Sequence, residues 1–183
     1  MKSGIYYILQ ALKSLARTGW MLRGVPKSLA ESVAEHSFLS AVVALVMASK
    51  LRFSGVDVDP LRATVLALIH DVGEAYIGDI AKVFDELAGA VKESVEIGVV
   101  EDMVENEFLK TLYREFHEGK TKEAQIAKLC DHLATYIQAR IYEGMGFDVE
   151  DVRRSSYERA LSIARKLGIE EFFINYVKEL EQK

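Results

Sequence analysis

At residues 65–80 the chain reads VLALIHDVGEAYIGDI, an apolar helical run that turns abruptly polar. The run ends in an imidazole and a carboxylate side by side, His70 and Asp71. Adjacent side chains on a helix point about 100° apart, so the two cannot both face the core squarely. A carboxylate is rarely buried without a partner, and the pair therefore favours a bound cation, most simply a divalent metal. A hydrogen-bonded structural histidine at the end of a core helix is the competing interpretation.

The composition is that of a globular protein. A length of 183 residues predicts one domain, 1–183, with room for a substantial core. The net charge of −5 argues against a nucleic-acid partner, because phosphate-binding surfaces are basic. No segment resembles a signal peptide or a membrane span, so we expect no membrane partner. The single cysteine, Cys130, cannot form an internal disulfide, which fits a cytoplasmic location.

The pattern of apolar residues predicts an all-α fold. No segment shows sustained two-residue alternation, and only two prolines interrupt the chain. Residues 32–52 are apolar nearly all round and should form the central helix, opened by a capping box of Ser32 and Glu35. Residues 17–29 are predicted to be irregular. The other predicted helices cover about residues 6–17, 59–70, 122–142, 149–167 and 170–181, with one or two more within 86–117.

Two further polar residues stand in apolar helical settings, as His70 and Asp71 do. His36 lies in the first turn of the central helix, and Asp131 lies mid-helix between Cys130 and His132 in a largely apolar segment. Burying an unpaired carboxylate is costly, so Asp131 needs a compensating partner. If the three helices pack together, two imidazoles and two carboxylates converge on a metal site that keeps positions open for water or substrate.

The order His36, His70-Asp71, Asp131 resembles the H…HD…D signature of the HD-domain metal-dependent phosphohydrolases. Three longer segments are similar to the 5′-deoxynucleotidase group of that family. They are SVAEHS at 32–37, HDVGEAYIGDI at 70–80 and RTGWMLRGV at 17–25. The resemblance covers most of the chain from about residue 10 to 140, and the three segments in order are far more specific than the short signature alone.

The resemblance implies a single HD domain with about seven or more helices around a metal site. Glu74, one turn beyond His70, would be the general acid/base beside the attacking water, and Asp79 would assist it or position the substrate. The ligand types do not choose among cobalt, manganese, nickel, zinc and iron. The residues implied to bind this one divalent ion are His36, His70, Asp71 and Asp131.

The resemblance also implies residues that hold the substrate. Arg17 or Arg23 would bind its phosphate, since a planar guanidinium engages phosphate oxygens in pairs, and we favour Arg17. Trp20 would lie near the sugar, where a bulky ring disfavours a 2′-hydroxyl; a plain core tryptophan is the alternative. We expect the remaining basic candidates to be ordinary surface or structural residues: Lys27, Lys82, His117 and His132.

The predicted function is that of a metal-dependent 5′-deoxynucleotidase, which hydrolyses deoxyribonucleoside 5′-monophosphates to deoxynucleoside and phosphate. The partner is a small-molecule nucleotide, and the resemblance suggests a homodimer. One alternative is an HD phosphohydrolase for a nucleoside triphosphate, a cyclic nucleotide or another phosphate ester. A second is a regulatory module that keeps the fold without turnover, although such modules typically lose ligands or the acid/base residue. A third is a helical interaction protein that binds no metal.

Overall fold

The computed structural model describes residues 4–80 and 83–182, with residues 83–90 described by their backbone only. Within these ranges the regular secondary structure is helical, apart from one isolated bridge. The prediction of an all-α fold is therefore confirmed. The helices are α1 (Ile5–Ser14), α2 (Thr18–Met21), α3 (Val33–Phe53), α4 (Pro60–Ile69), α5 (Glu74–Ile77), α6 (Val83–Met103), α7 (Glu107–Glu118), α8 (Lys122–Gly144), α9 (Glu150–Lys166) and α10 (Glu170–Glu181).

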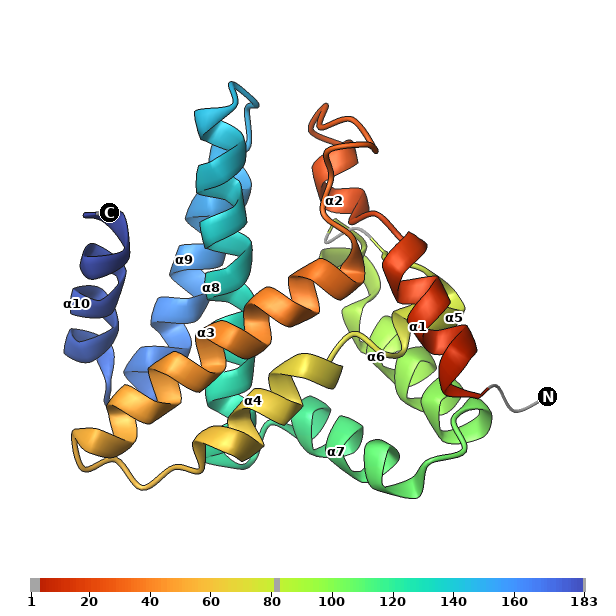
Figure 1. The fold of residues 1–183 in the computed structure, drawn as a ribbon, viewed down its shortest axis with the longest axis horizontal. Helices are drawn as coiled ribbons and strands as arrows, with labels where there is room; N and C mark the ends of the chain where they lie inside the picture. Colours follow the sequence, from red (N-terminus) through yellow and green to blue (C-terminus); the bar gives the residue numbers. More distant parts are fainter. Residues whose placement is uncertain (1–3, 81–82, 183) are drawn as a thin grey trace.

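Helices α3, α4 and α8 pack against one another and form the centre of the domain (Figure 1). Helix α9 lies along α8, with α10 outside it, while α1, α5 and α6 cover the opposite side. The main core lies where the three central helices meet and includes Met47, Leu66 and Leu129, all with no measurable exposure. Burying one such side chain contributes about 1.5–3 kcal/mol to stability, so this contact fixes the relative positions of the three helices.

Helix α3 begins with the predicted capping box. The hydroxyl of Ser32 accepts a hydrogen bond from the backbone of Glu35, and the Glu35 carboxylate accepts one from the backbone of Ser32. By length and composition α3 could cross a membrane, but half of its most apolar window is buried against the rest of the domain. It occupies the place of a core helix, and its first turn carries the fully buried His36 into that core.

The N-terminal segment differs from the prediction in two ways. Helix α1 ends at Ser14, because Leu15 is extended and Ala16 pairs with Ser32 in the isolated bridge. The segment predicted to be irregular contains the single helical turn α2. The backbone N–H of Arg17 donates to the carbonyl of Glu31 at 2.9 Å, which fixes this arginine beside the start of α3.

Candidate metal centre and substrate pocket

Four side chains from three helical elements converge in the interior. His36 comes from α3, His70 and Asp71 from the end of α4, and Asp131 from α8. The His36 Nε2 atom lies 2.9 Å from Asp131 Oδ1 and 3.9 Å from Asp71 Oδ2. The His70 Nε2 atom lies 3.1 Å from Asp71 Oδ2 and 3.6 Å from Asp131 Oδ1. Atoms that share one ion at about 2.1 Å are separated by roughly 3–4 Å, so this donor set fits a single divalent metal.

The hydrogen bonding of His70 supports the same conclusion. Its Nδ1 atom lies 2.7 Å from the Ala67 carbonyl, which can only accept, so Nδ1 carries the proton. The lone pair of a neutral imidazole is then on Nε2. That nitrogen is buried and makes no hydrogen bond among the described residues. A metal ligand oriented through its other ring nitrogen has this arrangement.

The electrostatics of the cluster also favour a cation. Burial lowers the pKa of His70, but Asp71 and Asp131 raise it by more, so the net pKa lies well above its usual range. Burial alone would raise the pKa of Asp131, yet its contacts with the two imidazoles hold that pKa well below normal. The two carboxylates thus favour a positive charge at this position, and a divalent ion bound here would displace the proton of His70.

Glu74 begins α5 directly beside the four-residue cluster. Its side chain is buried, and Oε2 has no hydrogen-bond partner within the described part of the chain. Burial, followed by the charges of Asp71 and Asp79, raises the pKa of Glu74 well above its ordinary value. A carboxyl group whose pKa is raised in this way can serve as a general acid or base. Gly73 leaves room for Tyr113 beside this turn, because a Cβ there would overlap the Tyr113 hydroxyl.

Arg17 and Asp79 belong to one connected unit. The Arg17 Nη1 group donates to Asp71 Oδ2 at 3.2 Å, which places the guanidinium at the edge of the metal-ligand set. The carboxylate of Asp79 accepts a hydrogen bond from the backbone N–H of Thr18, and the Thr18 hydroxyl donates to the Asp79 carbonyl. Asp79 thus fixes the segment that carries Arg17, which fits its predicted role in positioning better than a role as a second base.

The other two predicted substrate residues are held by protein contacts. Arg23 makes two-pronged contacts with Asp151 at the start of α9, and its Nη1 group donates to the Gly19 carbonyl. Those donors are occupied, which favours Arg17 as the phosphate ligand. Trp20 is 2% exposed, donates from Nε1 to a Glu31 oxygen at 2.8 Å and packs edge-on against Tyr142. It is a core tryptophan whose ring also lines the pocket.

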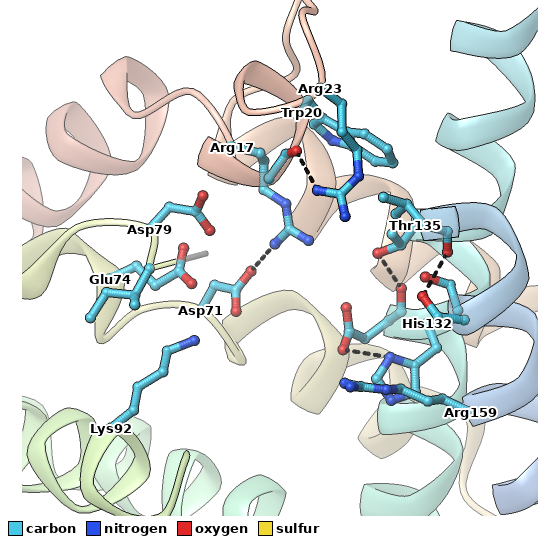
Figure 2. A pocket seen from close by; sticks show the side chains of 16 residues that line it. Arg17, Trp20, Arg23, Asp71, Glu74, Asp79, Lys92, His132, Thr135 and Arg159 are labelled. Carbon is cyan, nitrogen blue, oxygen red and sulfur yellow. Dashed lines mark hydrogen bonds and ion pairs between the residues drawn. The ribbon is translucent and has the colours of Figure 1, made fainter. Parts of the chain in front are cut away.

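The pocket opens in front of this cluster and has two walls (Figure 2). One wall carries Arg17, Asp71, Glu74 and Asp79, and Lys92 of α6 extends toward Glu74 and Asp71 from below. The facing wall is built by α8 and α9 and carries His132, Thr135 and Arg159. A phosphate ester in this space would meet cationic groups on both sides of the metal-ligand set.

Several residues that line the pocket or lie behind it were not predicted. Lys92 lies in a charged segment that looks like a solvated helix face, and Arg159 and Glu31 belong to no recognised motif. His132 was expected to be solvated or structural; its side chain is 25% exposed and lines the pocket. His117 instead packs against Tyr113 and contacts Glu93, away from the lining residues. Lys27 is exposed, and Lys82 lies outside the described residues.

The fold and the site define a helical domain built around a histidine–aspartate metal centre. Residues 9–169 match the HD domain family, so the chain belongs to the HD-domain family of phosphohydrolases. Membership implies a divalent metal, and the buried group of His36, His70 and Asp71 is present to hold it.

The proteins similar to this chain include two that are named 5′-deoxynucleotidases and one with a solved structure. The 5′-deoxynucleotidase HDDC2 of Dictyostelium discoideum is 28% identical over 154 residues, which are 80% of each chain. The 5′-deoxynucleotidase HDDC2 of Danio rerio is 32% identical over 72% of this chain and 64% of its own, slightly less than two thirds. A conserved hypothetical protein from Pyrococcus furiosus has a solved structure with a TM-score of 0.80 and 32% identity, covering 98% of this chain and all of its own.

Proposed function

We propose that the protein is a metal-dependent 5′-deoxynucleotidase that converts deoxyribonucleoside 5′-monophosphates to deoxynucleoside and phosphate. The observation that carries the proposal is a pocket in which the cluster of His36, His70, Asp71 and Asp131 adjoins Arg17 and the buried Glu74. The relatives named 5′-deoxynucleotidases add support, at identities near 30%.

The residues around the cluster have distinct roles in this reaction. A divalent ion held by the cluster would activate a water molecule and polarise a phosphoryl oxygen. Arg17 would bind the phosphate through the guanidinium donors that Asp71 does not use. Glu74 would accept a proton as the water oxygen bonds to phosphorus, and would return it to the 5′-oxygen as the phosphorus–oxygen bond breaks.

Selection for the deoxy sugar would come from the rigid wall at Trp20. Its ring is fixed by Glu31 and Tyr142 and cannot move away from a ribose. A hydroxyl buried without a partner costs about 1–3 kcal/mol, so kcat/KM for dAMP should exceed that for AMP by about ten-fold or more. Phosphate release with cobalt-loaded protein measures this ratio, and Trp20→Leu should reduce it. Equal turnover of dAMP and AMP would eliminate the role given to Trp20.

A longer phosphate chain is the second candidate for the substrate. The pocket is lined by Arg17, Arg23, Lys92 and Arg159, more cationic side chains than one monophosphate requires. The same assay with dATP separates the candidates, because a triphosphohydrolase releases triphosphate whereas a monophosphatase leaves dATP intact. The proposal expects phosphate from dAMP and no product from dATP.

We also propose that the protein is a homodimer that pairs through α3 and α4. These adjacent helices each expose large apolar side chains along one stripe, among them Phe38 and Val46 on α3 and Leu68 on α4. The sequence has no Asp, Glu, Lys or Arg between Glu35 and Lys50, so the exposed face of α3 fits an equally uncharged copy of itself.

Light scattering after gel filtration tests the dimer. Phe38→Glu should convert the protein to a monomer, because a carboxylate would be buried in the apolar interface. Phe108→Glu on α7 is the matched control, since Phe108 is 69% exposed and Phe38 67%. A wild-type monomer at about 50 µM, well above the Kd of a stable dimer, would contradict this proposal.

A further inference from the structure

One carboxylate oxygen of the buried Glu31 contacts three residues of the site. Its Oε1 atom accepts from Trp20 Nε1 at 2.8 Å and lies 3.8 Å from His36 Nδ1 and 4.0 Å from Arg17 Nε. Glu31 is only 7% exposed. Burying a carboxylate is costly unless its contacts compensate for lost hydration, and nothing in the proposed reaction uses this one.

The backbone around Glu31 holds this oxygen in place. The Glu31 carbonyl accepts from the backbone of Arg17 at 2.9 Å. Its own N–H donates to the hydroxyl of Tyr142 at 2.8 Å, and that hydroxyl donates to the carbonyl of Leu29 at 2.9 Å. Glu31 is therefore tied both to the segment that carries Arg17 and to α8, and its position does not depend on the contact with His36.

The two histidines of the cluster differ in whether the Nδ1 atom has a hydrogen-bond partner. His70 is oriented by a hydrogen bond from Nδ1 to the Ala67 carbonyl. His36 presents Nε2 to the carboxylates, and for that nitrogen to ligate an ion the proton of the neutral ring must sit on Nδ1. That buried Nδ1 atom has no hydrogen-bond partner in the described chain. The group that faces it is Glu31 Oε1, and a movement of about 1 Å would give a normal hydrogen bond.

We propose that Glu31 is a positioning residue of the metal centre. It accepts the Nδ1 proton of His36 and so keeps Nε2 available for the ion. The same oxygen also accepts from Trp20 and faces Arg17. One side chain therefore contacts both the predicted substrate-binding residues and the metal ligand His36. Carboxylates that orient a ligating imidazole in this way strengthen metal binding. The inference rests on the metal centre and not on the proposed nucleotide, so its test requires no turnover.

The test compares Glu31→Gln with Glu35→Gln. Both remove one negative charge from the same segment, but Glu35 is exposed and a glutamine also serves in its capping box. Cobalt affinity of demetallated protein is measured by competition with a chelator. Glu31→Gln should weaken it by about 10–100-fold, because the amide oxygen can still accept from Trp20 Nε1 but lacks the negative charge that strengthens His36 as a ligand. Glu35→Gln should change it less than about three-fold. Unchanged affinity in Glu31→Gln, or an equal loss in Glu35→Gln, would overturn the proposal.

Two spectroscopic measurements separate positioning from a general structural defect. Trp20 is the only tryptophan, and its emission should be unchanged in Glu31→Gln because the amide oxygen still accepts the indole N–H. In the zinc-loaded wild-type protein, nitrogen-15 NMR should show His36 protonated on Nδ1. The NMR measurement uses wild-type protein, so its result does not depend on whether a variant folds. A shifted Trp20 emission accompanying the loss of affinity, or His36 protonated on Nε2, would contradict the role of Glu31.

Discussion

Replacing Asp71 with asparagine is expected to remove most of the metal affinity and to lower kcat/KM by about 10³-fold or more. The Oδ2 atom of Asp71 faces both imidazoles and also accepts from Arg17. An amide of the same size keeps the packing but loses the anionic ligand. The loss of metal assistance is worth several kcal/mol, and each 1.36 kcal/mol is a factor of ten.

The matched control for this variant is Asp57→Asn, the same change at an exposed position before α4. It should retain wild-type metal content and kcat/KM. The Asp71→Asn protein should still fold, as judged by circular dichroism, because the amide has the same size and its oxygen can still accept from Arg17. If Asp71→Asn retained bound metal and kcat/KM within ten-fold of wild type, Asp71 would not be a ligand.

Glu74→Gln is expected to lower kcat by about 10²–10⁴-fold while leaving cobalt affinity within a few-fold of wild type. Glu74 is buried at the edge of the cluster, but it makes none of the four close contacts between the imidazoles and the carboxylates. Its removal should therefore abolish proton transfer without emptying the metal site. The measurements are kcat with dAMP and cobalt binding on the same preparation.

The exposed Glu105 provides the control for Glu74, and Glu105→Gln should leave kcat unchanged. Two results for Glu74→Gln would contradict its role. A kcat near that of wild type would mean that another group transfers the proton. A parallel loss of cobalt binding and kcat would make Glu74 a ligand and not the acid/base residue.

The sequence predicted the parts of the fold and site that depend on local patterns. Apolar periodicity located the long helices, and the capping box marked the start of α3. His36 and Asp131 stood out because each is a polar residue in an otherwise apolar helical segment. Their convergence with His70 requires only that three apolar helices share one core, and the packing of α3, α4 and α8 provides it.

The rest of the site depends on contacts between distant segments, which leave no local pattern. Arg23 is paired with Asp151, 128 residues later, and no periodicity reveals that its donors are occupied. Glu31 looks like an ordinary charged residue before a helix until Trp20 and Tyr142 bury it. Lys92 belongs to a segment of mixed charge, in which the side chain that faces a pocket cannot be distinguished from a solvated one.

We propose that hydrolysis of a deoxynucleotide requires a metal ion held by His36, His70, Asp71 and Asp131. The most direct measurement titrates cobalt, manganese or zinc into demetallated protein and follows bound metal and phosphate release from dAMP on the same sample. We expect one tightly bound ion per chain, with phosphate release rising in proportion to the fraction of protein that carries the ion. Phosphate release that persists at full rate without bound metal, or one bound ion that brings no release from dAMP, would contradict this proposal.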